Sequence, residues 1–423
     1  MVRVKTSKRS IRQYKNFVST QLYNDILELS KSLKGLRVAE INATANAGGV
    51  AELLSSIVPI LNSLSLDVSW YVLPPNEEFF EVTKFIHNCL QGKRGELSKR
   101  QKSVYLSHTE EFSKSIAKIK ADIFVIHDPQ PLAAIHFLDG AIKPAVWRCH
   151  IDLSNPNKNV WEFLKPYAIA FDKLVFSMPE YVPYDIPPDK VSIFTPTIDP
   201  LNPKNVPMAK EKAKRIVSMF GIDLRKPLVT QVSRFDPWKD PMGVIYAYKI
   251  AKRKIPKLQL ALVGEFASDD PEGVRIYEEI KKETLNDPNL FVLCLPHSNE
   301  TINAFQTVSD VIIQKSIREG FGLTVTEAMW KAKAVIGGRV GGIKYQIEDD
   351  KSGILVSDVS ECSRAIVELI QDHKLRSKLG KKAKERVREN FLMPRKVLDW
   401  LLVFKELARD SSYLRVRQRF LLR

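Results

Sequence analysis

Short apolar runs alternate with longer amphipathic stretches along the first half of the chain. Residues 36–41 and 68–73 are apolar runs, and residues 50–62 between them carry apolar side chains at helical spacing. This order predicts a strand, a helix and a second strand. Later apolar runs predict further strands at 123–126, 145–149 and 174–176. Such alternation is typical of a parallel sheet covered by helices.

A proline-rich segment separates the two halves of the chain. Residues 195–207 contain four prolines, which cannot continue a helix and fit a linker. Beyond Leu355 the pattern indicates mainly helices to the end of the chain. Between these two points the alternation restarts, and it predicts strands at 227–232, 258–263, 290–295, 311–314 and 334–337.

We therefore predict an α/β protein of two doubly wound, Rossmann-like domains that face each other across a ligand cleft. The first domain is expected at 1–200 and the second at 201–390. Residues 391–423 are expected to form a helical segment that packs back on the first domain. A length of 423 residues agrees with two domains of about 200 residues each.

The composition is typical of a globular protein, with 44% hydrophobic and 27% charged residues. The apolar runs are too short and too often interrupted for a transmembrane span. Residues 1–5 contain two basic side chains, but no apolar stretch of the kind found in a signal peptide follows them. We therefore expect a cytoplasmic protein that does not bind membranes.

The formal net charge of +16 leaves two interpretations open. One is nucleic-acid binding, and the other is a well-solvated surface with a cleft for an anionic substrate. The second is favoured, because the basic residues are scattered and no long basic block interleaves with aromatic residues. The four cysteines are far apart and form no Cys-x-x-Cys pair, so a structural zinc site is not expected.

Two glutamates flank a glycine-rich turn in the second half of the chain. Glu319 and Glu327 cannot share one straight helix, because Gly320 and Gly322 lie between them. We expect Glu319 on a loop and Glu327 in the first turns of the following helix, where negative charge is favoured. Two unrelated surface glutamates are the alternative, but they do not explain a Gly-Phe-Gly sequence that weakens a helix start.

Two further segments carry groups that can bind phosphate. Arg234 and Lys239 lie on either side of Pro237 and offer a diphosphate one forked set of donors and one point charge. A solvated basic loop is an equally good interpretation. Gly48 and Gly49 precede a predicted helix, where backbone N–H groups and the helix dipole favour an anion. Judged alone, this glycine pair is better interpreted as a tight turn.

Residues 147–152 end a predicted strand, the position at which open α/β folds bind ligands. In its neutral form His150 can hydrogen-bond a sugar hydroxyl, although a core histidine would explain the same position. His127 and Asp128 end another strand and are weaker candidates of the same type. The glycine-rich residues 337–342 offer another approach to phosphate or sugar, with a plain loop as the alternative.

Together these motifs resemble the retaining glycosyltransferases of family 4, which have the GT-B architecture. The resemblance covers nearly the whole chain. It depends on the order and spacing of a first Gly-Gly, Arg-x4-Lys, Glu-x7-Glu and a late Gly-Gly followed by residues 352–356. Residues 147–157 and 316–338 are similar to trehalose-forming members of the family. One departure is that many members have Gly-Gly-x-Pro-Glu where this chain has Lys344 and Tyr345, so no role of that Glu is carried over.

The resemblance implies that glucose passes from a nucleoside-diphosphate-glucose to free glucose and forms trehalose with retention. ADP- and UDP-glucose are the expected donors, and the reaction is open to reversal. The implied roles follow the motifs: Gly48, Gly49, Arg234 and Lys239 for the diphosphate, Glu327 for the ribose, Glu319 for glucose near O3 and His150 for glucose near O6. Further donor contacts are expected from Leu295, Pro296, Gly322 and Leu323, and acceptor contacts from Arg148 and Asp152.

The implied mechanism requires neither a cofactor nor a metal ion. A donor phosphate oxygen takes the proton of the acceptor, and Arg234 and Lys239 neutralise the leaving group in place of a metal. A covalent intermediate on Glu319 is the competing mechanism, because retaining glycosidases use a carboxylate in this way. It is ranked lower, since the sequence shows no suitable second acid.

Several other functions compete with this interpretation. Another family 4 transferase and a trehalose phosphorylase would use a related site, whereas a nucleic-acid-binding protein is supported only by the net charge. A non-catalytic sugar sensor would not need both ionic motifs, and a dehydrogenase is disfavoured because Gly-x-Gly-x-x-Gly is missing. A homodimer is also considered, because four apolar residues near the end of the chain either form a dimer contact or pack within the chain: Trp400, Leu401, Leu402 and Phe404.

Overall fold

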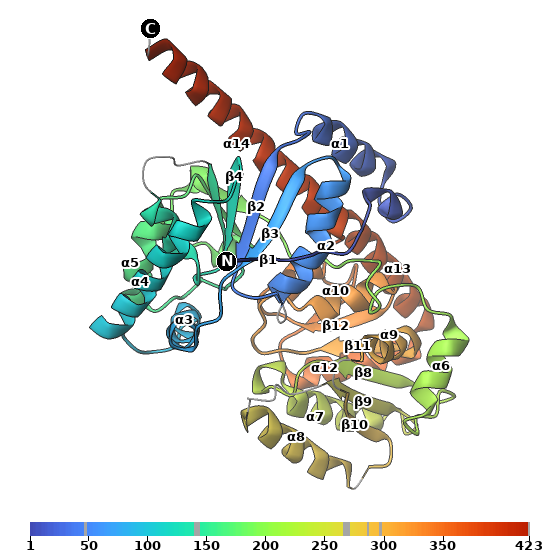
Figure 1. The fold of residues 1–423 in the computed structure, drawn as a ribbon. Coiled ribbons are helices and arrows are strands. Elements are labelled where there is room, and N and C mark those ends of the chain that lie inside the picture. The colour runs from blue at the N-terminus through green and yellow to red at the C-terminus, as the bar shows by residue number, and fades with distance from the viewer. Residues whose placement is uncertain (46–48, 139–143, 265–270, 286, 296–297, 422–423) are drawn as a thin grey trace. The chain divides into compact units, whose positions relative to one another are not determined.

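A computed structural model describes the chain except for residues 46–48, 139–143, 265–270, 286, 296–297 and 422–423, and for the side chains of 271–272, 284 and 409–421. The chain forms two compact units (Figure 1). The first unit contains Met1–Thr195 together with Met393–Arg423, and the second contains Pro196–Leu392. The chain therefore leaves the first unit at the start of the proline-rich segment and returns to it at the start of the last helix.

One sheet runs through the first unit. Among the described residues it has seven strands in the order β1-β3-β2-β4-β5-β6-β7, all parallel except β1, which pairs antiparallel with β3. The strands are β1 (Val2–Arg3), β2 (Arg37–Asn42), β3 (Asp67–Val72), β4 (Ile123–His127), β5 (Ala145–Arg148), β6 (Lys173–Phe176) and β7 (Val191–Ile193). The predicted parallel sheet is thus confirmed for this half of the chain.

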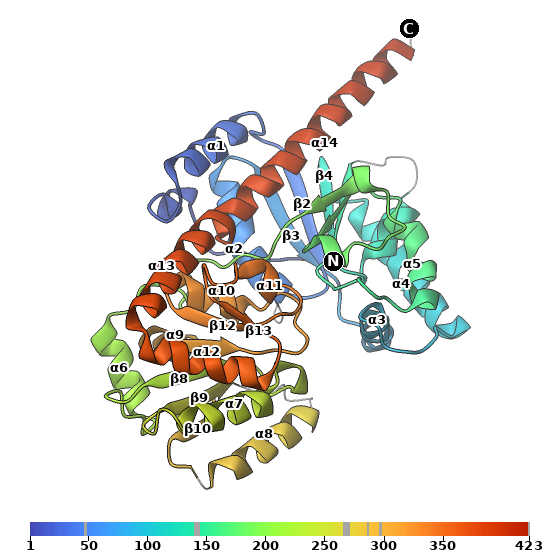
Figure 2. The ribbon, with the colours of Figure 1, turned by 180° about the vertical axis from the view of Figure 1, so that it is seen from behind.

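Helices cover both faces of this sheet. They are α1 (Thr20–Lys31), α2 (Gly49–Ser63), α3 (Glu77–Leu90), α4 (Lys99–Ile116), α5 (Lys158–Ala168) and α14 (Met393–Leu421), with short 3₁₀ helices at η1 (Ile11–Tyr14), η2 (Leu132–Phe137), η3 (Pro179–Tyr181) and η4 (Pro188–Lys190). Figures 1 and 2 show α1, α2 and α14 on one face and α3, α4 and α5 on the other. Asn76, Ser98 and Asn157 fix where α3, α4 and α5 begin, because each side-chain oxygen accepts a backbone N–H of the first turn.

The last helix belongs to the core of the first unit. Helix α14 packs against α1, α2 and β4. The ring of Trp400 meets Phe194 edge-on at a centroid distance of 4.9 Å and also stacks on Phe404. Trp400, Leu401 and Phe404 are buried in this core, whereas Leu402 is half exposed. Of the four apolar residues considered for a dimer contact, only Leu402 is therefore exposed.

The second unit is built on another parallel sheet. Its described strands number six, in the order β10-β9-β8-β11-β12-β13. They are β8 (Leu228–Val232), β9 (Gln259–Gly264), β10 (Leu290–Cys294), β11 (Val311–Gln314), β12 (Ala334–Gly338) and β13 (Ile354–Val356). The change in strand order between β8 and β11 is a topological switch point, the position at which doubly wound sheets bind ligands.

The helices of the second unit also form two layers. They are α6 (Lys210–Ser218), α7 (Pro241–Lys252), α8 (Pro271–Thr284), α9 (Asn299–Val308), α10 (Leu323–Trp330), α11 (Ile343–Gln346), α12 (Val359–Gln371) and α13 (His373–Asn390), with a 3₁₀ helix η5 (Pro237–Lys239). Val229 faces a core that includes α7 and α12, and its neighbour Leu228 faces a core that includes α6 and α9. Both faces of the sheet are therefore buried, which explains why its strands are continuous apolar runs.

The described helices include none that is both long enough and apolar enough to cross a lipid bilayer.

Candidate active site

The ionic motifs of the second unit lie at the carboxyl ends of β8 and β11. These two strands are hydrogen-bonded neighbours, with Val311 opposite Val229 and Ile312 opposite Thr230. The loop after β8 carries Arg234 and Lys239, and the loop after β11 carries Glu319. The fold therefore brings together two motifs that are 80 residues apart in sequence.

Lys239 and Glu319 bind each other directly. The Lys239 ammonium lies 2.8 Å from both Glu319 carboxylate oxygens, and the Ser316 hydroxyl donates to Oε2 of Glu319 at 3.2 Å. The two charged side chains are only 17% and 9% exposed, so water screens their attraction weakly. Glu319 lies on a loop, as predicted.

Arg234 is the more accessible cation of this motif. Its side chain is 57% exposed, and its guanidinium lies 3.4 Å from Oδ2 of Asp236. Asp236 also caps the short helix η5, because its Oδ1 accepts the backbone N–H of Trp238. The proline-fixed turn is thus held by a carboxylate, and the Arg234 guanidinium remains exposed at its rim.

Glu327 lies in the second turn of α10 and is buried. The Gln306 side-chain amide lies 3.4 Å from Oε2 of Glu327, and the Lys331 ammonium donates to Oε1 of Gln306 at 2.9 Å and to the backbone carbonyl of Glu327 at 3.2 Å. Burial lowers the pKa of Lys331 to about 8, although the Glu327 charge opposes that shift. Glu327 is therefore held by an amide whose other end is held by a cation.

The late glycine pair packs against the Glu319 loop. A Cβ on Gly341 would lie 1.8 Å from the carbonyl oxygen of Glu319, and one on Gly342 would lie 2.5 Å from the Cα of Phe321. The Gly342 amide also donates to the Gly320 carbonyl at 2.9 Å. These two glycines thus allow two backbone segments to approach closely. The plain-loop interpretation explains this contact without a phosphate.

Gln346 is a residue of this region that the sequence analysis missed. It is fully buried, and its side-chain amide donates to the carbonyl of Phe321 and lies 3.4 Å and 3.3 Å from those of Gly322 and Gly342. Its amide oxygen accepts the hydroxyl of Thr326. Gln346 therefore connects the glycine-rich turn to the first turns of α10. The preceding residue, Tyr345, stands where many family members have the Glu of Gly-Gly-x-Pro-Glu, and it is 40% exposed.

The other predicted donor contacts are only partly described. Gly48 and Pro296 lie outside the described residues. Gly49 is the first residue of α2, and a Cβ there would touch no other atom. Leu295 is half-buried and its amide donates to the Gly264 carbonyl, whereas Leu323, at the start of α10, is 41% exposed. Gly322 begins that helix with a φ of +83°, a conformation that favours glycine.

In the first unit, His150 belongs to a hydrogen-bonded chain of three side chains. Nε2 of His150 lies 3.0 Å from Nδ1 of His127, and Nε2 of His127 lies 2.7 Å from Oε2 of Glu40. Asp128 holds the same turn, because its Oδ1 accepts the backbone N–H of His150 at 2.8 Å. Burial lowers the pKa of His150 well below its usual value, and the positive charge of Arg148 lowers it further. His150 is therefore neutral near pH 7.

Arg148 and Asp152, the predicted acceptor contacts, occupy different environments. Arg148 is buried, and its guanidinium donates to the Ser177 hydroxyl and to the Phe194 carbonyl, both at 3.1 Å. Burial lowers the pKa of Arg148 to about 10. Asp152 is partly exposed and accepts the backbone N–H of Ser154. Arg148, two residues before His150 in the sequence, is thus a buried cation. Of the two predicted acceptor contacts, only Asp152 is exposed at the surface.

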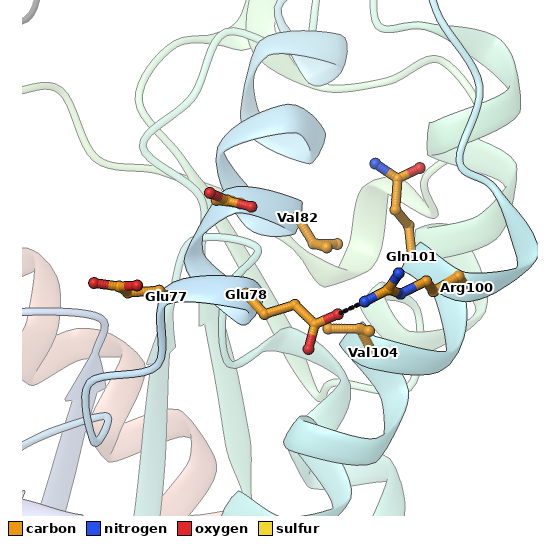
Figure 3. A pocket seen from close by; sticks show the side chains of 7 residues that line it. Glu77, Glu78, Val82, Arg100, Gln101 and Val104 are labelled. Carbon is orange, nitrogen blue, oxygen red and sulfur yellow. Dashed lines mark hydrogen bonds and ion pairs between the residues drawn. The ribbon is translucent and has the colours of Figure 1, made fainter.

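No group of three or more His, Cys, Asp or Glu side chains within the described part of the chain is arranged to hold a metal ion. The surface also has a hollow of about 530 Å³ between α3 and α4, lined by Glu77, Glu78, Glu81 and Arg100 (Figure 3). Arg100 pairs with Glu78 there. Its predominantly acidic lining opposes binding of a diphosphate, so we assign it no part in the donor site.

Two helix-covered units, each built on a parallel sheet, are the architecture of GT-B glycosyltransferases, and paired charged side chains lie at the topological switch point of the second sheet. The model of glycosyl transferases group 1 matches residues 213–386, and the model of the trehalose synthase N-terminal domain matches residues 40–183. The chain belongs to the trehalose synthase family of glycosyltransferases.

Curated relatives match the chain over nearly its whole length. The trehalose synthase of Pyrococcus horikoshii is 44% identical over 95% of this chain and 98% of that protein, and that of Rubrobacter xylanophilus is 41% identical over 96% and 99%. A trehalose phosphorylase of Pleurotus pulmonarius is 28% identical over 89% of this chain and 58% of that protein.

Solved structures share the fold at low sequence identity. An α,α-trehalose 6-phosphate synthase from Burkholderia multivorans has a TM-score of 0.70 at 16% identity and covers 91% of this chain and 98% of its own. An Anabaena protein in complex with UDP and glucose has a TM-score of 0.64 at 14% identity, covering 89% and 100%. These likenesses bear on the fold alone.

Proposed function

We propose that the chain transfers glucose from a nucleoside-diphosphate-glucose to free glucose, with retention of the anomeric configuration, and so forms trehalose. The observation that carries this proposal is the Lys239–Glu319 pair beside exposed Arg234, at the switch point of a sheet in a trehalose synthase family member. It supplies two cations for a diphosphate and one carboxylate for a sugar within a single pair of loops.

Arg234 and Lys239 suit the chemistry of the leaving group. When the anomeric bond breaks, the nucleoside diphosphate gains negative charge, and cations fixed beforehand stabilise that charge most at the transition state. The Lys239 ammonium has three donors and contacts Glu319 on one side, so it can bind a phosphate oxygen with the others. We propose that the two cations do the work of a metal ion at this step.

Glu327 and Glu319 are assigned to the two sugars of the donor. A carboxylate accepts hydrogen bonds only, so it binds hydroxyls, and both are held in place before substrate arrives. Glu327 is fixed through Gln306 and is proposed to bind the ribose, and Glu319 is fixed by Lys239 and Ser316 and is proposed to bind glucose near O3. His150, neutral and partly exposed, is proposed to bind the transferred glucose near O6.

The contact with Lys239 also favours one retaining mechanism over the other. Both oxygens of Glu319 lie 2.8 Å from the ammonium, which lowers their nucleophilicity. A covalent glucosyl-Glu319 is therefore disfavoured. We propose attack by the acceptor on the face of the leaving group, with a phosphate oxygen taking the acceptor proton.

Product analysis tests this function. The protein is mixed with glucose and, in separate reactions, with ADP-, UDP- or GDP-glucose or with α-glucose 1-phosphate in the presence of a chelator, and the products are identified by NMR and chromatography. Trehalose with an equal amount of nucleoside diphosphate is expected. Trehalose formed only from α-glucose 1-phosphate would show a phosphorylase instead, and no turnover of any donor would refute the proposal.

A further inference from the structure

Three side chains from neighbouring strands of the first unit form one hydrogen-bonded line. Glu40 lies within β2, His127 ends β4 and His150 follows β5, and these strands are consecutive in the sheet. Glu40 is opposite Val125 in the register, and His127 is opposite Arg148. The line therefore starts in the core and ends at the carboxyl ends of the strands, where His150 is partly exposed.

The geometry of this line fits two directed hydrogen bonds. The distances are 2.7 Å from Glu40 Oε2 to His127 Nε2 and 3.0 Å from His127 Nδ1 to His150 Nε2. The two imidazole planes differ by only 17°, so the lone pair of one ring nitrogen can point along the N–H of the other. Glu40 and His127 are 0% and 1% exposed, and water therefore does not compete for these contacts.

The chemistry of the three groups fixes the direction of the bonds. An ionised carboxylate only accepts, so Nε2 of His127 must carry a proton. A neutral His127 then has a bare Nδ1, which accepts from Nε2–H of His150. The remaining nitrogen of His150, Nδ1, is consequently left without a proton and can accept a hydrogen bond.

Positive charge already lies next to this line. His127 occupies the strand position opposite Arg148, whose guanidinium is buried. Lys396, also fully buried, lowers the pKa of His150, although burial lowers the pKa of Lys396 itself. Asp128 is the opposing carboxylate, but burial raises its pKa, which weakens its effect as a counter-charge. The single carboxylate of Glu40 is then enough to set the direction of both hydrogen bonds in the line.

Glu40 is costly for the fold, which argues against a purely structural role. Its second oxygen, Oε1, is buried and has no hydrogen-bond partner within the described residues. An uncompensated buried carboxylate destabilises a protein, whereas an amide could fill the same space with less desolvation. An amide, however, can both donate and accept, and so would not fix the direction of the line.

We infer that Glu40 is a positioning residue, which acts through His127 to keep the proton of His150 on Nε2 and to leave Nδ1 as an acceptor for a hydroxyl of the transferred glucose. This inference rests on the proposed function in that it assigns the sugar contact to His150. The arrangement of protons itself is independent of any substrate.

Histidine ¹⁵N NMR measures this arrangement directly. Long-range ¹H–¹⁵N spectra of protein labelled at its seven histidines distinguish a protonated ring nitrogen from a bare one, and a His150→Gln variant identifies the signals of His150. In the unsubstituted protein a single tautomer with Nε2–H is expected for His150. A proton on Nδ1 of His150 would overturn the inference, whatever the variants do.

The Glu40→Gln variant keeps the shape of the side chain but no longer fixes the direction of the hydrogen bonds along the line. Both tautomers of His150 are then expected, and kcat for trehalose formation should fall by roughly 10- to 100-fold, as is typical when a residue behind a contacting histidine is changed. The KM for the donor should change much less than kcat, because most donor contacts lie in the second unit.

Thr109→Val is the matched control, since Thr109 is a fully buried polar residue of α4 whose hydroxyl bonds only to backbone carbonyls of its own helix in the described contacts. It should leave both the His150 signals and kcat unchanged. An unchanged tautomer in Glu40→Gln would refute the positioning role even if the variant were slow. If the unsubstituted protein makes no trehalose, the proposed function fails, and the NMR result still decides the proton arrangement.

Discussion

The Glu319→Gln substitution removes the negative charge next to Lys239 but keeps the shape of the side chain. In the free protein this charge neutralises the ammonium that is proposed to bind the diphosphate, at 2.8 Å. Its removal should therefore strengthen the binding of a nucleoside diphosphate. The same change should weaken the binding of a nucleoside-diphosphate-glucose, because an amide is a poorer acceptor for the glucose hydroxyls than a carboxylate.

The magnitudes follow from burial. Fully exposed ion pairs contribute at most about 1 kcal/mol, and this pair is 17% and 9% exposed, so about 1 kcal/mol is a reasonable lower figure. That corresponds to a roughly fivefold lower Kd for the nucleoside diphosphate. Charge-assisted hydrogen bonds to the glucose contribute about 1.5–3 kcal/mol, so their loss exceeds this gain by about 0.5 kcal/mol or more and should raise the Kd of the sugar nucleotide by roughly twofold or more.

Isothermal titration calorimetry with the nucleoside diphosphate and with its glucose conjugate measures both effects. Glu211→Gln is the control, because it removes one carboxylate that pairs with Lys214 on the surface of the same unit and changes the net charge equally. This control should change neither affinity. If Glu319→Gln weakens both ligands by the same factor, Glu319 does not compete with the diphosphate for Lys239, and the assignment of the two residues to phosphate and sugar is wrong.

Three further outcomes are expected. Glu327→Ala should weaken nucleotide binding and activity without unfolding the chain, and unchanged donor affinity in calorimetry would contradict the ribose contact. Arg234→Ala should lower kcat more than donor affinity, whereas an effect confined to KM would indicate ground-state binding. Burial lowers the pKa of Lys331 and of Lys333 to about 8. Between about pH 8 and 10 the unfolded chain therefore binds more protons than the folded chain, so the free energy of unfolding should rise with pH. Urea unfolding of a Lys331→Met variant should show a smaller rise.

The fold was largely predictable because its longer strands are buried on both faces. A continuous apolar run between glycines, prolines or polar residues indicates such a strand, as at β8 and β11. The strands that the sequence analysis missed are β1, β7 and β13, which have two or three residues each. Runs this short carry no periodicity, and they become strands only because a neighbouring strand of the sheet supplies the hydrogen bonds.

The site was predictable only where it departs from ordinary patterns. Glycines beside glutamates, and a proline between two cations, drew attention to Glu319, Glu327, Arg234 and Lys239. That Lys239 binds Glu319 depends on the pairing of β8 with β11, which local sequence does not encode. Glu40 did leave a signal, since it is a charged residue between the apolar residues Ala39 and Ile41 of a strand, and a buried charge requires a buried partner.

In each unit the charged groups of the candidate site are paired before any substrate binds. Lys239 has Glu319, and in the first unit the Glu40 carboxylate has His127. Pairing of this kind offsets part of the cost of burying each charge, and it fixes the donors and acceptors so that they need not reorganise during the proposed reaction. It also sets a limit on affinity, because a substrate must replace or share an existing partner. In the proposed mechanism, a site built in this way would favour the transition state, in which charge has grown on the leaving group, over the ground state of the donor.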